Sequence, residues 1–130
     1  MKIYIASSWK NQHAVEMLTT LLRVEGHEVL SFVENNYDEG HAPDQNFDFE
    51  KWVQTDAANN SFNYDTDGAT KSDLVVYISP SGTDAWAEVG AAWSAGVPIL
   101  GLYTASEPSA LSSLSAAFHT SCKLVFACDL

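Results

Sequence analysis

Positive charge is scarce in this chain. Only 6 of its 130 residues are Lys or Arg, against 17 Asp or Glu, so the formal net charge is −11. Proteins that bind nucleic-acid polymers or anionic membrane surfaces use clusters of basic side chains. The basic residues here are scattered along the sequence. The composition therefore argues against a nucleic-acid polymer or a membrane surface as a partner.

Cysteine and long apolar runs are also scarce. The two cysteines, Cys122 and Cys128, form no CxxC motif and offer no disulfide framework. No apolar run approaches the roughly 18 residues that a membrane-spanning helix requires. The sequence opens on a strand pattern instead of a basic segment followed by an apolar stretch and a cleavage site. We therefore expect a cytoplasmic protein.

Signatures of metal and hydrolase sites are missing as well. The chain has no HExxH motif and no Cys/His pair at ligand spacing, and its four histidines share no spacing typical of a metal site. It contains neither a GxSxG nucleophile elbow nor a Walker loop. We expect no metal and no cofactor.

The residues that are present predict one α/β domain over residues 1–130. The chain is 46% apolar, which is too apolar for disorder, and its length is typical of a single domain. Apolar runs predict strands at residues 2–6, 28–33, 74–78, 99–103 and 123–127. Helical spacing predicts helices at about 11–25, 64–72, 84–95 and 107–118, an irregular helix around 47–57, and a loop at 34–46. This alternation favours a doubly wound parallel sheet of about five strands in three layers, with ligands at the carboxyl ends of the strands.

Glu88 is the most informative residue. It is the only charge in residues 85–95, a stretch so apolar that we expect the helix to be buried nearly all round. The positions three and four residues later are Ala91 and Ala92, so no basic side chain offsets it on the helix. Carboxylates in such places cost stability and are often nucleophiles or general acids. The alternative is an exposed Glu, or one near the helix amino end, where the dipole favours an anion.

Three further carboxylates, Asp65, Asp67 and Asp73, precede the third predicted strand. Each is equally well explained as a helix cap or a turn residue. In the functional interpretation, one of them protonates a leaving base while Glu88 attacks the sugar. That is the two-carboxylate chemistry of retaining glycosyl transfer.

The loop after the first predicted strand holds Ser7, Ser8, Trp9 and Lys10. An indole in such a loop can stack on a flat base, and a lysine there can meet a phosphate, although such a lysine is more often only solvated. Tyr4, in the strand itself, is equally compatible with a core position.

The turn after the third predicted strand, residues 79–84, can offer backbone N–H groups to an anion or a ribose hydroxyl. Within it, Ser81 and Asp84 also fit a capping box, which would explain the same residues without a ligand.

Three segments together resemble the nucleoside 2-deoxyribosyltransferase family. They are residues 1–11, residues 64–67 with Asp73, and residues 80–90, where Pro-x-Gly-x-x-Ala-x-x-Glu-x-Gly is followed by Gly96 and Pro98. The resemblance covers roughly residues 1–103, and the segments occur in the family's order. It implies a flavodoxin-like fold and an enzyme whose Glu attacks C1′ of a nucleoside, a 2′-deoxynucleoside or a 5′-monophosphate. The base is released and a glycosyl-enzyme ester remains.

The resemblance also implies roles for individual residues. Glu88 would be the nucleophile, Tyr4 the hydroxyl that holds its carboxylate, and Asp65 the acid that handles the base, with Asp67 next in line. Trp9 would line the base pocket. Near the 5′ end of the sugar the resemblance places Ser81 and Gly82.

Two departures from the family favour base release over transfer. Transferases carry a second Asp six residues before the nucleophile, where this chain has Gly82, and Asp84 is the nearby candidate to replace it. They also borrow a polar C-terminal residue from a neighbouring subunit, which residues 127–130 do not match. The family's subunit contacts and the four tryptophans of this chain favour a homo-oligomer. A non-catalytic nucleotide-binding module, flavodoxin-like or TIR-like, is the alternative.

Overall fold

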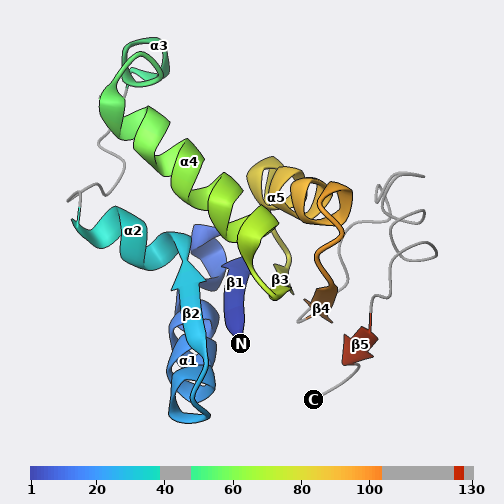
Figure 1. Cartoon of the computed structure of the whole chain (residues 1–130). Coiled ribbons are helices and arrows are strands. Elements are labelled where there is room, and N and C mark those ends of the chain that lie inside the picture. Colours follow the sequence, from blue (N-terminus) through green and yellow to red (C-terminus); the bar gives the residue numbers. More distant parts are fainter. Residues whose placement is uncertain (39–47, 104–124, 128–130) are drawn as a thin grey trace.

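Five strands form one parallel sheet in the computed structural model, which describes residues 1–38, 48–103 and 125–127. The strands are β1 (Lys2–Ala6), β2 (Glu28–Ser31), β3 (Leu74–Ser79), β4 (Ile99–Tyr103) and β5 (Val125–Ala127). Their order is β2-β1-β3-β4-β5, so the chain reverses direction across the sheet between β1 and β3 (Figure 1). This is the flavodoxin-like order of a doubly wound sheet, and it confirms the predicted fold class.

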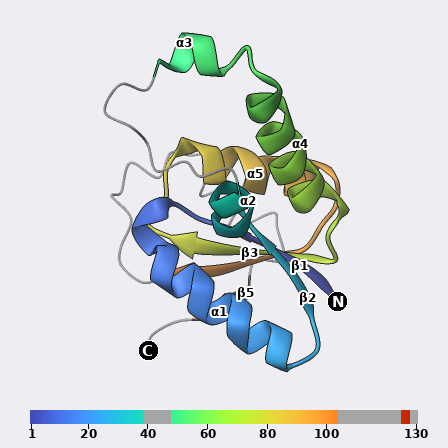
Figure 2. The same ribbon diagram turned by 90° about the vertical axis from the view of Figure 1, so that its left-hand side faces the viewer.

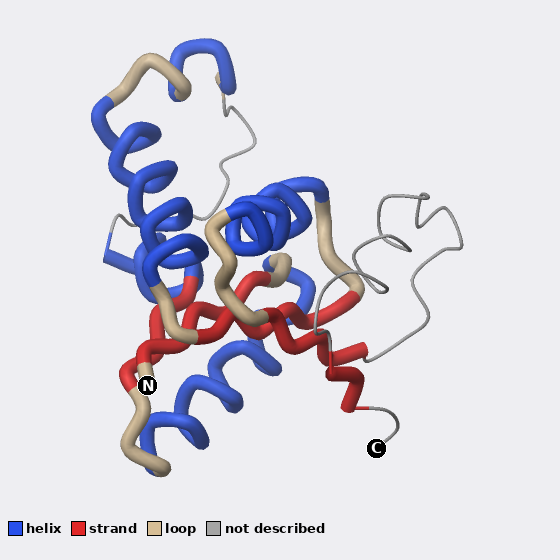
Figure 3. Tube along the Cα trace, turned by 45° about the vertical axis from the view of Figure 1, so that its right-hand side comes forward, coloured by secondary structure: helices blue, strands red, loops and turns tan. Residues whose placement is uncertain are grey.

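Helices cover both faces of the sheet and give three layers. On one face lies α1 (Gln12–Val24), and on the other lie α4 (Asp56–Lys71) and α5 (Thr83–Ser94) (Figures 2 and 3). Because side chains alternate along a strand, β1 sends Ile3 and Ile5 into the core against α1. It sends Tyr4 into the core against α4 and α5.

Three of the predicted elements have different bounds. The strand expected to end at residue 33 ends at Ser31, and Phe32 begins α2 (Phe32–Asp38), which occupies part of the predicted loop. Phe32 and Val33 are buried with Val15 of α1, so tertiary packing overrides their strand propensity. The predicted helix 64–72 is the second half of α4, which starts after the Thr55 side chain caps the Ala58 N–H. Within residues 48–57 the structure has the short α3 (Phe49–Trp52) and then the first residues of α4.

The helix α5 is not buried all round. It buries Ala85, Val89 and Ala92, whereas Trp93 is 48% exposed. The apolar run therefore reflects small alanines that let the helix approach the sheet, not burial on every side. Gly96 ends this helix, as predicted, with a positive φ of 75°.

The expected helix at 107–118 lies outside the described residues. Within the described ranges, no helix has the length and apolarity needed to cross a membrane.

Candidate active site

Tyr4, Asp65 and Glu88 come together between β1, α4 and α5. The buried Tyr4 hydroxyl donates a hydrogen bond of 3.0 Å to Oδ1 of Asp65. Gly68, one turn after Asp65, makes this approach possible, because a Cβ at that position would overlap the Tyr4 ring. The resemblance implied that Tyr4 holds Glu88; in the structure the Tyr4 hydroxyl donates its hydrogen bond to Asp65. Its hydroxyl is still near enough to Glu88 to influence the pKa of that carboxyl.

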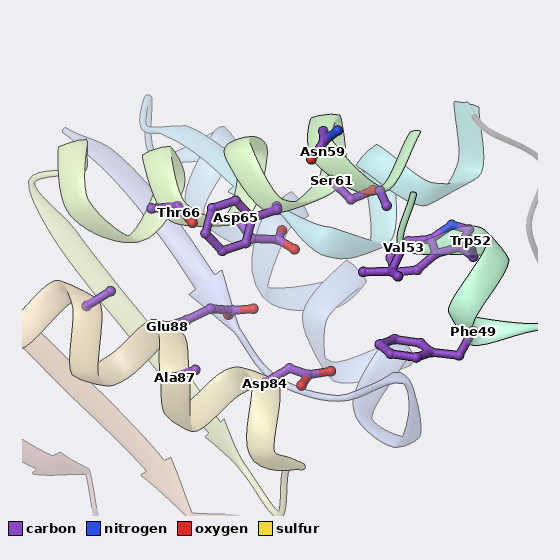
Figure 4. A pocket seen from close by; sticks show the side chains of 13 residues that line it. Phe49, Trp52, Val53, Asn59, Ser61, Asp65, Thr66, Asp84, Ala87 and Glu88 are labelled. Carbon is purple, nitrogen blue, oxygen red and sulfur yellow. The ribbon is translucent and has the colours of Figure 1, made fainter. Parts of the chain in front are cut away.

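Glu88 reaches toward Asp65 from α5 (Figure 4), and its Oε2 atom is buried with no hydrogen-bond partner. Burial, and next the negative charge of Asp65, raise the pKa of Glu88 to about 8, while the Tyr4 hydroxyl opposes the shift. Burial also raises the pKa of Asp65 to about 6, again opposed by the hydrogen bond from Tyr4. The two carboxyl groups therefore change protonation near neutral pH, as acid–base groups of enzymes do.

Tyr4 stays protonated beside this pair. Burial, and then the charges of Glu88 and Asp65, raise the pKa of its phenol well above the usual range. The residue is thus a fixed hydrogen-bond donor and not a base.

A pocket of about 620 Å³ opens beside the carboxyl pair, between α3, α4 and α5 (Figure 4). This volume suits a small organic ligand. Its charged lining is Asp65, Glu88 and, at the first turn of α5, Asp84. The structure thus brings three predicted site residues to one cavity. The remaining lining residues are Phe49, Trp52, Val53, Ala58, Asn59, Ser61, Phe62, Thr66, Ala87 and Ala91.

The aromatic side of the pocket was not predicted as part of a site. Phe49 and Trp52 of α3 lie with their ring centroids 6.1 Å apart, and Phe62 of α4 joins them in the lining. Phe49 is 62% exposed and Phe62 is 68% exposed, which leaves flat apolar surface available to a ligand. The only sequence signal for this wall is a group of aromatic residues within an otherwise polar stretch.

The structure does not bring Trp9, Lys10 or Asp67 to the pocket lining. Trp9 lies edge-on against Phe32, with ring centroids 5.1 Å apart, and Lys10 beside it is exposed. Asp67 follows Asp65 by two residues, so it points to a different side of α4. There it forms a 2.8 Å ion pair with Lys71.

Ser7 and Ser8 bind protein groups rather than facing the pocket. Ser7 Oγ donates to the Ile78 carbonyl at 2.8 Å, and Ser8 Oγ donates to the Pro80 carbonyl at 3.4 Å. Asn11, which sequence reasoning missed, donates from Nδ2 to Ser7 Oγ at 2.9 Å and to the Pro80 carbonyl at 2.7 Å. We call these five residues the loop clamp, because they join the loop after β1 to the loop after β3.

Ser81 and Gly82 stand just before α5. The Ser81 hydroxyl is hydrogen-bonded to the Tyr77 hydroxyl at 2.7 Å. Gly82 is the N-cap of α5 and no side chain caps the helix, so the capping box of Ser81 with Asp84 is wrong. Asp84 instead lines the pocket and helps to raise the pKa of both Asp65 and Glu88.

The described residues contain no group of His, Cys, Asp and Glu side chains arranged to hold a metal ion.

Comparison with known proteins gives structural neighbours only. No family model and no curated protein sequence matches this chain. A 2-deoxyribosyltransferase from Bacillus psychrosaccharolyticus matches with a TM-score of 0.68 and 23% identity, over 99% of this chain and 87% of that one. A CMP N-glycosidase from Clostridium botulinum matches with a TM-score of 0.62 and 17% identity, over 97% and 87%. The chain thus has the flavodoxin-like fold that is found in nucleoside 2-deoxyribosyltransferases.

Proposed function

We propose that this protein cleaves or transfers the N-glycosidic bond of a nucleoside, with Glu88 as the nucleophile. The observation that carries the proposal is the buried carboxyl of Glu88, whose Oε2 atom lacks a partner beside Asp65 in a ligand-sized pocket. The similar structures support it, because one is a 2-deoxyribosyltransferase and the other a CMP N-glycosidase.

In the proposed reaction the Glu88 carboxylate attacks C1′ and forms a glycosyl ester. The electron pair of the C1′–N bond passes to the base, which Asp65 protonates as it leaves. Water or a second base then attacks C1′, gives its proton to the Asp65 carboxylate, and releases the Glu88 carboxylate. Tyr4 positions Asp65 through its hydrogen bond, and Asp84 adds negative charge at the mouth of the pocket.

Protonation of the pair decides which form reacts. Burial raises the pKa of Glu88 to about 8 and the pKa of Asp65 to about 6, so the pair retains a proton near neutral pH. In the reacting form this proton is on Asp65 and Glu88 is ionised.

The pocket favours a nucleoside over a nucleotide. Its described lining contains three carboxylates and no Lys or Arg, so a 5′-phosphate would meet repulsion without a partner. Gly82, in place of the transferases' second Asp, favours base release to water. Assembly into a homo-oligomer and a cytoplasmic location remain predictions from the sequence.

Base release from a panel of 2′-deoxynucleosides and 5′-monophosphates, followed by chromatography, tests the function. We expect wild type to release base and Glu88→Gln to lose at least about 10³-fold in rate, as typical for removal of a nucleophile. The control is Asp67→Asn, which removes a carboxylate of α4 outside the pocket and should keep full activity. Equal release by wild type and Glu88→Gln, or no release across the panel, would refute the assignment.

A binding module without turnover is the second candidate. The observation in its favour is the burial of Glu88, which raises the pKa of its carboxyl and so suits a hydrogen-bond donor to a ligand better than a nucleophile. Nucleoside binding that survives in Glu88→Gln, with no product formed by wild type, would establish this alternative.

A further inference from the structure

The pocket has a one-sided charge distribution. Every ionisable side chain in its described lining is acidic, and these residues are Asp65, Asp84 and Glu88. Three described basic side chains are held in ion pairs elsewhere: Arg23 with Glu34, Lys51 with Asp48, and Lys71 with Asp67. A cavity lined by one sign of charge concentrates ligands of the opposite sign.

The opposite wall of the cavity also favours a cation. Phe49 and Trp52 present aromatic rings to the same space, at the far side from Glu88 and Asp65 (Figure 4), and Phe62 of α4 is also part of the lining. The face of an aromatic ring attracts a positive charge within about 6 Å, with indole the strongest. A flat cationic ring bound between the acidic side chains and the aromatic rings would interact favourably with both.

We propose that the preferred substrate is a nucleoside with a cationic base and no 5′-phosphate. This inference rests on the proposed function, since it names the substrate class of the same pocket. A base alkylated or substituted at the nitrogen of the glycosidic bond, such as a pyridinium, carries a fixed positive charge and matches the carboxylates and the aromatic wall.

The chemistry of such a substrate fits the pair of acids. When the Glu88 carboxylate attacks C1′, the electron pair of the C1′–N bond neutralises the ring, and the base leaves uncharged without needing a proton. Water then attacks C1′, the ester bond breaks, and the products are the free sugar, the Glu88 carboxylate and one proton. Asp65 is free to remain ionised throughout and to stabilise positive charge.

The positive charge of the base would also favour the ionised form of Glu88, which is the proposed nucleophile. Burial raises the pKa of Glu88, and a positive charge within about 4–6 Å favours the ionised carboxylate. A neutral base lacks this effect.

Binding to the inactive Glu88→Gln variant tests the charge preference without turnover. Nicotinamide riboside is a cation, and benzamide riboside is an uncharged compound of nearly the same shape, so isothermal titration with both isolates the charge. We expect at least about 10-fold tighter binding of the cation, weakened by salt and reduced several-fold by adding Asp84→Asn. Adding Asp67→Asn is the matched control and should leave the preference unchanged. Both the ribose and the 2′-deoxyribose forms are titrated. Nicotinamide mononucleotide, which adds a 5′-phosphate, is expected to bind more weakly than nicotinamide riboside.

The outcomes separate this inference from the proposed function. Equal binding of the cation and its neutral counterpart, while wild type cleaves neutral nucleosides, would overturn the cationic substrate and leave the function intact. Charge-selective binding without base release by wild type would overturn the function and support the ligand class. For wild type, the ratio of enzymatic to spontaneous cleavage should be larger for nicotinamide riboside than for neutral nucleosides.

Discussion

The loop clamp follows the end of β1, and the Asp65–Glu88 pair lies beside Tyr4 within β1. The two polar groups differ in how their hydrogen bonds are satisfied. In the clamp, Ser7 and Asn11 donate to protein acceptors at 2.7–2.9 Å. In the pair, Oε2 of Glu88 is buried without a partner. Buried polar groups are nearly always paired, so an unpaired one requires an explanation. The clamp therefore stabilises the fold. Burial of the unpartnered Glu88 Oε2 atom instead costs folding free energy, which a ligand can restore by donating a hydrogen bond to that atom.

Removing the charge of the pair should have the largest effect on stability. The folded pKa of Glu88, about 8, lies above the ordinary value of 4.5. Between these pH values the folded state holds a proton that the unfolded state has lost, so stability falls as pH rises through this window. Gln cannot ionise, so Glu88→Gln should be more stable than wild type at pH 8.5 by up to about 5 kcal/mol, since the pKa is raised from 4.5 to about 8 at about 1.4 kcal/mol per pKa unit.

Thermal and urea unfolding at pH 8.5 and pH 4 measure this difference. At pH 4 both states of wild type are mainly protonated at position 88, so the gain should nearly vanish. The matched control, Glu25→Gln, changes an exposed carboxylate and should show no such dependence on pH. A gain of equal size at both pH values would contradict the buried-charge explanation.

Gly68→Ala should have the next largest effect on stability, because it displaces Tyr4, which holds Asp65. The added Cβ would overlap the Tyr4 ring in the core, and overpacking of this kind costs typically about 1–3 kcal/mol. Tyr4 must move, so its hydrogen bond to Asp65 should weaken and base release should fall with stability. Urea unfolding and the base-release assay measure the two losses. Asn60→Ala, at an exposed position of the same helix outside the pocket lining, provides the control. Unchanged activity in Gly68→Ala would show that Tyr4 does not position Asp65.

Most of the fold could be predicted from the sequence, because buried parallel strands are continuous apolar runs. Residues 74–78 illustrate this, since each from Val75 to Ile78 is buried in the structure. The misassigned element was α2, where Phe32 and Val33 favour a strand by propensity but reach the core from a helix. That choice depends on how α1 packs, which local sequence does not encode.

The candidate site could be predicted only in part, and for a related reason. Glu88 was recognisable as a lone charge in an apolar helix, and Asp65 and Tyr4 followed from the family resemblance. Phe49 and Trp52 reach the pocket only because α3 lies beyond the start of α4 (Figure 1). Conversely, Trp9 and Ser7 belong to the expected ligand loop, yet their contacts are with Phe32 and Ile78. Short-range patterns show which residues are unusual, but the cavity is made by contacts distant in sequence.

Breaking the loop clamp should reduce stability and leave the pair intact. Asn11→Ala removes the donor to the Pro80 carbonyl and to Ser7 Oγ, and a lost buried hydrogen bond costs about 1–2 kcal/mol. The loss should be the same at pH 5 and pH 8.5, unlike the effect of Glu88→Gln. Urea unfolding at both pH values measures it, with exposed Asn60→Ala as the control. A loss of base release larger than the loss of stability would mean that the clamp contacts the ligand after all.

The smallest expected effect is on KM, and it distinguishes Trp52 from Trp9. Trp52 lines the pocket and Trp9 packs on Phe32 outside the described lining. Stacking of a base on an aromatic side chain contributes about 1–3 kcal/mol to binding. Because Phe49 and Phe62 remain, the binding free energy lost in Trp52→Ala should lie in the lower part of that range. We expect its KM to rise about 5-fold with kcat nearly unchanged, while Trp9→Ala should alter KM by less than about 2-fold. Steady-state base release measures both constants. The reverse order would place the base in the loop after β1, as the family resemblance implied, and would leave the aromatic wall of α3 and α4 without a role in binding.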